Sequence, residues 1–202
     1  MNVGILVFDE VEALDFAGPY EVFTTANRMH GRLHPGQDAP FAVRCIARDA
    51  APVRARAGLR VLPDAGFADA PASDLLIVPG GVVDQAMACP ATLDWIATAA
   101  RTAGTVAAVC TGAFLLARAG VLGAGPVTTH WEDIDDLRGA FPALDVRAGP
   151  RWVAHDAAGR VFTSAGISAG LDLSLHLVAR LAGEALALRT ARQLDYDWRQ
   201  TP

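Results

Sequence analysis

Cys110 stands where a predicted buried strand, residues 105–109, runs directly into a predicted helix. So short a turn forces its residue into a strained backbone conformation with the side chain exposed above the sheet, and Gly112 would let the helix approach closely. This order is typical of a nucleophile elbow. The helix N-terminus would also favour a thiolate, so we expect a lowered pKa for Cys110. The alternative is a small core residue, because free cysteine is among the most buried residue types.

Residues that follow two other predicted strands could meet Cys110. Asp15 comes after the first strand, and Gly80 and Gly81 come directly after another. Because ligands of an open parallel sheet bind outside the carboxyl ends of its strands, we expect these segments to converge on one crevice. There Asp15 could transfer protons, and the backbone N–H groups of Gly81 and Thr111 could receive developing negative charge. The alternative for Asp15 is an N-terminal cap of the helix that follows it.

Other cysteine and histidine residues lack that context. Cys45 lies within a predicted strand and Cys89 precedes a proline at a helix boundary, so both are interpreted as structural. His130 ends a predicted strand 20 residues after Cys110, and it either tunes the thiolate or hydrogen-bonds within the core. No His or Cys pair has the HExxH or CxxC spacing of a zinc site.

The elements that would position these residues are short apolar runs that alternate with longer helical patterns. This alternation predicts a mostly parallel sheet with helices on both faces. Strands are predicted at residues 3–8, 41–47, 75–78, 105–109, 127–129, 145–147, 152–155 and 160–163. Helices are predicted from residue 18 and at residues 90–102, 111–119, 133–141, 168–182 and 184–194, with a surface hairpin at 52–63. No repeat or linker divides the sequence, so residues 1–202 are predicted to form one doubly wound α/β domain.

Composition excludes several classes of protein. All 17 basic residues are arginine, and without lysine there can be no Schiff-base or pyridoxal-phosphate enzyme and no P-loop. The net charge of -5 argues against a nucleic-acid surface. The apolar runs are too short to span a membrane, and the N-terminus has no signal-peptide pattern. Three widely spaced cysteines suit a reducing cytoplasm, which is the expected location.

Five sequence blocks, in order along nearly the whole chain, carry a family resemblance. They are LDFAGP at residues 14–19, VPGG at 78–81, VCTGA at 109–113, TTHW at 128–131 and SAGISAGLD at 164–172. Together they resemble the ThiJ/PfpI superfamily, which shares its α/β core with class I glutamine amidotransferases. The resemblance implies a single-domain, flavodoxin-like fold.

Within the superfamily the blocks most resemble the isonitrile hydratase branch, which adds water to an isocyanide to give an N-substituted formamide. The resemblance implies that Cys110 is the nucleophile and Asp15 the acid/base group, in a homodimer without metal or organic cofactor. PfpI-type proteases carry His directly after the Cys, where this sequence has Thr111, and the chaperone and deglycase branch uses a Glu where this sequence offers Asp15. Both departures disfavour those activities.

The chemistry of isocyanide hydration suits these residues. A thiolate can add to a protonated isocyanide carbon to give a thioimidate, from which water then displaces Cys110. Asp15 would supply the proton and activate or relay a proton from the water, while Thr111 would orient one of the partners. The walls of the substrate pocket are expected from Tyr20, Phe114, Trp131 and Ile167, with His130 nearby.

A binding protein is the alternative to an enzyme. The blocks at residues 110–113 and 128–131 also resemble the N-terminal sensor domains of AraC-type transcription regulators, which bind a small molecule and need not catalyse a reaction. A DNA-binding module would have to follow, and the sequence ends at Pro202, six residues past Tyr196, so we expect the enzyme. Under either hypothesis the partner is a small molecule, with no nucleic acid and no membrane.

Overall fold

The computed structural model describes residues 1–201 of the chain, and a seven-stranded sheet lies at the centre of that part. The order of its strands is β10-β11-β7-β6-β1-β2-β5, and every neighbouring pair is parallel except β10 with β11. The strands are β1 (Asn2–Leu6), β2 (Ala42–Ala47), β5 (Ala65–Gly66), β6 (Leu75–Val78), β7 (Thr105–Val109), β10 (Trp152–Ala154) and β11 (Val161–Ser164). The predicted mostly parallel α/β sheet is confirmed.

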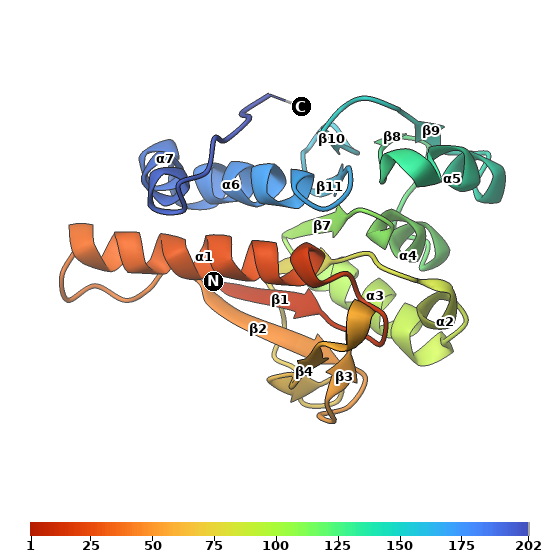
Figure 1. The fold of residues 1–202 in the computed structure, drawn as a ribbon, viewed down its shortest axis with the longest axis horizontal. Coiled ribbons are helices and arrows are strands. Elements are labelled where there is room, and N and C mark those ends of the chain that lie inside the picture. The colour runs from red at the N-terminus through yellow and green to blue at the C-terminus, as the bar shows by residue number, and fades with distance from the viewer. Residues whose placement is uncertain (202) are drawn as a thin grey trace.

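Helices cover both faces of the sheet. One face packs against α1 (Ala13–Leu33), α6 (Ala169–Ala182) and α7 (Glu184–Gln193), and the other against α3 (Pro90–Thr102), α4 (Gly112–Arg118) and α5 (Ile134–Ala140). Figure 1 shows α1, α6 and α7 packed against one another, apart from α3 and α4. Ile5 lies in the first core and its neighbour Leu6 in the second, because successive strand residues point to opposite faces. Both faces of the central strands are therefore buried, and the sequences of β6 and, after Thr105, of β7 are apolar without alternation.

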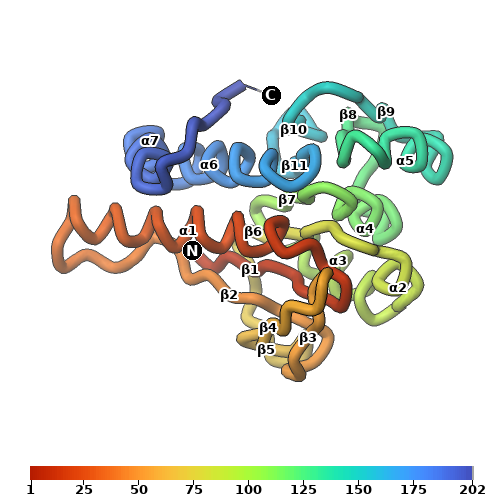
Figure 2. Tube along the Cα trace, in the orientation of Figure 1, coloured from red at the N-terminus to blue at the C-terminus, as the bar shows by residue number. Residues whose placement is uncertain are grey.

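Shorter elements surround the carboxyl edge of the sheet. They are the hairpin of β3 (Val53–Arg54) and β4 (Arg60–Val61) with the turn η1 (Arg56–Gly58) between them, the helix α2 (Asp84–Met87), the parallel pair β8 (Pro126–Val127) and β9 (Asp145–Val146), and the turn η2 (Trp131–Asp133). Figure 2 shows the chain after α7 running back over α6 to the C-terminus. Among the described residues, no helix combines the length and the hydropathy that a bilayer crossing requires.

The start of α1 differs from its prediction. The helix begins at Ala13 and not near residue 18, because the side chain of Glu12 caps it by accepting a hydrogen bond from the Ala13 N–H at 3.1 Å. Pro19 lies inside the helix, where it removes one backbone hydrogen bond, that to the carbonyl of Asp15. Asp15 is therefore a residue of the first helical turn, and its interpretation as the helix cap is wrong.

Candidate active site

Cys110 occupies the turn between β7 and α4 with a φ of 57°, in the left-handed region that residues other than glycine rarely adopt. Its N–H donates to the carbonyl of Ser164 at 3.2 Å, and its own carbonyl accepts from the hydroxyl of Thr129 at 2.9 Å. A Cβ at position 112 would collide with the carbonyl oxygen of Val78, so only glycine fits there. The strained elbow that the sequence suggested is present, and it is fixed from two neighbouring segments. The expectation of an exposed side chain is wrong, because Cys110 is buried, with 7% of the residue exposed.

Asp15 lies with its carboxyl group at Cys110 and has no exposed surface. Its Oδ2 accepts a hydrogen bond from the N–H of Gly80 at 3.1 Å, whereas Oδ1 has no hydrogen-bond partner among residues 1–201. Burial raises the pKa of Asp15 to about 7, although the N–H of Gly80, the thiol of Cys110 and the N–H of Ile167 each favour the charged form. Near neutral pH this carboxyl group is therefore poised between its acid and base forms.

The thiol of Cys110 does not behave as predicted. Burial raises its pKa to about 12, and the negative charge of Asp15 adds to this effect, while the N–H of Thr111 acts in the opposite direction. The expected lowering by the helix N-terminus is therefore wrong for this conformation. The reason is that desolvation of the buried thiol and the charge of Asp15 outweigh the N–H donor of Thr111 before α4. Cys110 is therefore a thiol at neutral pH, and a thiolate requires that Asp15 accept its proton.

The glycines after β6 are engaged within the protein. The N–H of Gly80 holds Asp15, and the N–H of Gly81 donates to the hydroxyl of Thr111 at 2.8 Å. That hydroxyl donates in turn to the carbonyl of Gly81 at 2.8 Å. Neither glycine N–H is free to receive developing charge in this conformation, contrary to the sequence prediction. Thr111 instead ties the strand-end segment of Gly80 and Gly81 to the Cys110 turn, and its own N–H is the backbone donor that acts on the sulfur.

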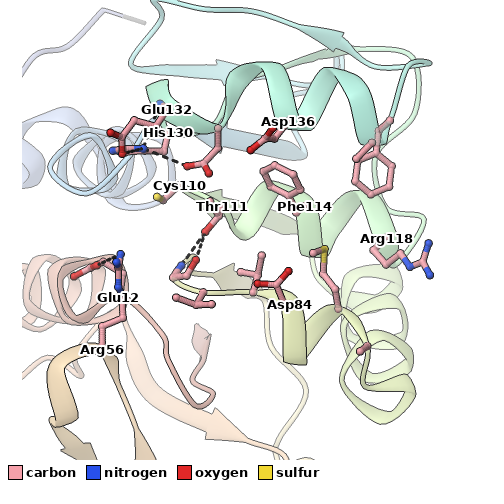
Figure 3. A pocket seen from close by; sticks show the side chains of 18 of the residues that line it. Glu12, Arg56, Asp84, Cys110, Thr111, Phe114, Arg118, His130, Glu132 and Asp136 are labelled. Carbon is pink, nitrogen blue, oxygen red and sulfur yellow. Dashed lines mark hydrogen bonds and ion pairs between the residues drawn. The ribbon is translucent and has the colours of Figure 1, made fainter.

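A cavity of about 790 Å³ opens beside Cys110 (Figure 3). Of the predicted wall residues, Phe114, Ile167 and His130 line it. Tyr20 and Trp131 are not among its lining residues, and the side chain of Trp131 is directed to solvent, with 75% of the residue exposed. The prediction for Tyr20 is wrong for a similar reason, because this residue lies on the outer side of α1 and is 38% exposed.

Charged side chains that the sequence analysis did not assign to the site also line this cavity. They are Glu12, Arg56, Asp84, Arg118, Glu132, Asp133 and Asp136. Arg56 comes from the β3–β4 hairpin and pairs with Glu12 at 3.2 Å, at the mouth of the cavity (Figure 3). In the sequence, Asp133 and Asp136 lie at the start of the predicted helix 133–141, where carboxylates interact favourably with the helix dipole. That position explains these residues without any role in a cavity. Only the tertiary position of η2 and α5 over α4 brings them to Cys110.

His130 belongs to the wall of the cavity and not to the core. Its Nδ1 lies 3.2 Å from a carboxylate oxygen of Asp133 and 3.8 Å from one of Glu132. Its ring lies against Gly166, where a Cβ would collide with it. His130 is thus oriented by the η2 turn and faces the same space as Cys110 (Figure 3). Within residues 1–201, no group of three or more His, Cys, Asp or Glu side chains is arranged to hold a metal ion.

Residues 1–180 match the model of the DJ-1/PfpI family. The chain belongs to the DJ-1/PfpI family. It is 35% identical over 199 residues to the isonitrile hydratase of Pseudomonas putida, with 97% of this chain and 78% of that protein covered. The crystal structure of a ThiJ/PfpI family protein from Pseudomonas syringae superimposes on this DJ-1/PfpI chain with a TM-score of 0.82 at 29% identity, covering 98% of this chain and 76% of the other.

Regulators form a second group of relatives of this DJ-1/PfpI chain. It is 32% identical over 196 residues to the HTH-type transcriptional regulator GbdR of Pseudomonas aeruginosa, covering 97% of this chain and 51% of GbdR. The chain therefore spans about half the length of the regulators it matches. The relatives of this chain thus include both an enzyme and transcription regulators.

Proposed function

We propose that this DJ-1/PfpI chain hydrates isocyanides to N-substituted formamides, with Cys110 as nucleophile and Asp15 as proton carrier. The observation that carries the proposal is the buried thiol–carboxyl pair at the cavity, in which the pKa of Asp15 is raised to about 7. A carboxyl group with that pKa can both accept a proton and return it near neutral pH, which general acid–base catalysis requires. The isonitrile hydratase of Pseudomonas putida, a relative that matches nearly the whole chain, supports the same reaction.

The first half of the reaction forms a covalent intermediate. Asp15 as carboxylate accepts the proton of the Cys110 thiol while the sulfur bonds to the terminal carbon of the isocyanide. Asp15 then gives that proton to the same carbon, which produces a thioimidate, R–N=CH–S–Cys110. The proton lost by sulfur is the one gained by carbon, so no external acid is needed. The N–H of Thr111 would stabilise the sulfur as it becomes negative.

The second half releases the product. A water molecule adds its oxygen to the thioimidate carbon, and Asp15 moves one proton from that water to the nitrogen. The C–S bond of the resulting adduct breaks, the hydroxyl group becomes the formamide carbonyl, and its proton returns to sulfur through Asp15. The sum is the addition of one water to one isocyanide, and Cys110 ends as a thiol.

Turnover of phenyl isocyanide by the purified protein tests this proposal. The expected result is formation of N-phenylformamide, seen by mass spectrometry, with loss of activity after alkylation of Cys110 or in Cys110→Ala. The matched control is Cys89→Ser, which changes another thiol and is expected to keep wild-type turnover. Wild-type rates in Cys110→Ala would show that the mechanism is wrong.

A sensor domain is the second candidate function. It is favoured by the relatives among transcription regulators and by a cavity of about 790 Å³ with many charged lining residues, more than addition to a two-atom group requires. A sensor would bind a small molecule at Cys110 without converting it. Saturable binding of phenyl isocyanide with no formamide over many protein equivalents would favour this candidate over the enzyme.

A further inference from the structure

Ile167 links the active site to a network of polar side chains on the far side of the β11–α6 connection. It lines the cavity beside Cys110, and its φ of 53° lies in the left-handed region. Its backbone N–H acts on the carboxyl group of Asp15 and favours the charged form. A β-branched residue in this conformation is strained, so the surrounding contacts must hold it there.

Arg151 contacts the chain on both sides of Ile167. Its carbonyl accepts the N–H of Ala165 at 2.8 Å, and its guanidinium donates to the hydroxyl of Ser168 at 3.2 Å. The Nε of the same guanidinium donates to a carboxylate oxygen of Asp172 in the first turn of α6. One arginine therefore fixes the residues two before and one after the strained position.

Asp172 connects this arginine to the segment that follows α7. Asp172 has no exposed surface, and its second carboxylate oxygen accepts the backbone N–H of Arg199 at 2.9 Å. Its carbonyl accepts the indole N–H of Trp198 at 3.2 Å, and the hydroxyl of Tyr196 donates to the carbonyl of Ser168 at 3.3 Å. Figure 2 shows this segment lying over α6. Residues 196–199 are thus hydrogen-bonded to Ser168, directly before α6, and to Asp172 within it, which Arg151 also contacts.

The ion pair of Arg151 and Asp172 is not explained well by a gain in folding stability. Desolvation of a buried carboxylate costs several kcal/mol, and its ion pair often does no more than offset that cost. Hydrogen bonds from Arg151 and from residues 196–199, by contrast, fix the position of the α6 N-terminus and of the loop before it. The network therefore suits a role in geometry at the site that the loop lines.

We propose that Arg151 and Asp172, together with residues 196–199, hold the strained backbone of Ile167 in the cavity wall beside Cys110 and so set the reactivity of Cys110. They are positioning residues, because none of them lines the cavity. The inference also gives the segment after α7 a role, since any force on residues 196–199 would act on Asp172 and through it on the site. Its readout through turnover rests on the proposed hydratase function.

Loss of the Ile167 contact has a predictable sign. The N–H favours the charged form of Asp15, so its withdrawal raises the pKa of Asp15 above about 7. The other titratable groups that act on Asp15 are Glu12 and Cys110, and Asp133 acts on Cys110 as well. The variants below leave all of these groups in place.

Asp172→Asn tests the inference in the full chain, because it keeps the shape of the side chain and removes its charge. We expect kcat for phenyl isocyanide to fall roughly 10-fold with KM changed less than about twofold, and the acid limb of the pH profile to move to higher pH. Ser168→Ala, which removes one acceptor of Arg151, is expected to act in the same direction with a smaller effect. The matched control is Asp145→Asn, which breaks the exposed pair with Arg147 (2.7 Å) and is expected to change neither quantity.

A second readout does not depend on turnover. The rate of iodoacetamide labelling of Cys110, followed on its peptide by mass spectrometry across pH, reports the ionisation of the thiol and of Asp15. A shifted profile in Asp172→Asn but not in Asp145→Asn supports the inference even if the wild type converts no isocyanide, in which case only the proposed function fails. If Asp172→Asn does not fold, Trp198→Phe, which keeps an aromatic side chain and loses the indole N–H, replaces it. Wild-type labelling profiles in the folded variants would overturn the inference.

Discussion

Cys110 and Cys89 both precede a helix, yet their thiols are affected in opposite directions. Cys89 is the residue before α3, and its pKa is lowered, first by the hydroxyl and then by the N–H of Thr92, with a contribution from Arg48. Cys110 is separated from α4 by Thr111, and its pKa is raised to about 12. Both thiols accept hydrogen bonds from groups at the start of a helix, so these donors alone do not explain why the two pKa values move in opposite directions.

Burial and charge explain it. Cys89 is partly exposed and has an arginine nearby, whereas Cys110 is buried and has Asp15 beside it. The more acidic thiol is thus the one outside the candidate active site. A nucleophile that stays protonated until a neighbouring carboxylate takes its proton is protected from unproductive reactions, and the reactivity of Cys110 then depends on Asp15.

Asp15→Asn gives the largest expected effect and acts on the two cysteines differently. Turnover of phenyl isocyanide should fall by roughly 100-fold or more, because the proton carrier is lost. The pKa of Cys110 should fall at the same time, because the nearby negative charge is gone, so its labelling by iodoacetamide should become faster. Labelling of Cys89 should not change, and it serves as the internal control. Slower labelling of Cys110 in this variant would contradict the assigned electrostatics.

The pH dependence of turnover comes next. Because the pKa of Asp15 is raised to about 7, the carboxyl group is protonated below that pH and cannot accept the thiol proton. We expect kcat/KM to be half-maximal near pH 7 and to fall about 10-fold per unit well below it. Steady-state rates from pH 5 to pH 9 check it, and a flat profile across pH 7 would exclude Asp15 as the acceptor.

Direct competition between the thiols should give a smaller difference. At pH 8 we expect iodoacetamide to label Cys89 about 10-fold faster than Cys110 in the wild type, since the lower nucleophilicity of the more acidic thiolate offsets only part of its greater abundance. Peptide mass spectrometry over a time course measures both rates in one sample. Faster labelling of Cys110 would mean that its thiolate is more abundant than the buried pair allows.

Local patterns predicted much of the fold. The bounds of β6, β7 and α3 agree with the sequence prediction, because Asp74 and Pro79 flank β6, Pro90 begins α3 and Gly104 precedes β7. The start of α1 was misplaced, since Gly and Pro at residues 18–19 look like a helix start while Glu12 supplies the cap. The short elements α2 and β5 carry too few residues for a pattern.

The site could be predicted only in part, for a physical reason. Strand ends identify Cys110, Asp15 and the glycines, because the edge of a parallel sheet brings them together. The pKa values of Asp15 and Cys110 depend on burial, and the effect of Asp133 on Cys110 depends on the packing of η2. Neither can be predicted from the local spacing of residues. The single-domain organisation, the homodimer and the cytoplasmic location stay predictions of the sequence.

Thr92→Val gives the smallest expected effect and tests why Cys89 is the more acidic thiol. The substitution removes the hydroxyl that contributes most to its lowered pKa and keeps the buried shape of the side chain. We expect labelling of Cys89 at neutral pH to slow about threefold, in keeping with a modest rise in its pKa. The matched control is Thr98→Val on the same helix, whose hydroxyl accepts only from Arg101 at 3.0 Å. Equal labelling of Cys89 in both variants would leave the backbone N–H of residue 92 and the side chain of Arg48 as the causes of its lowered pKa.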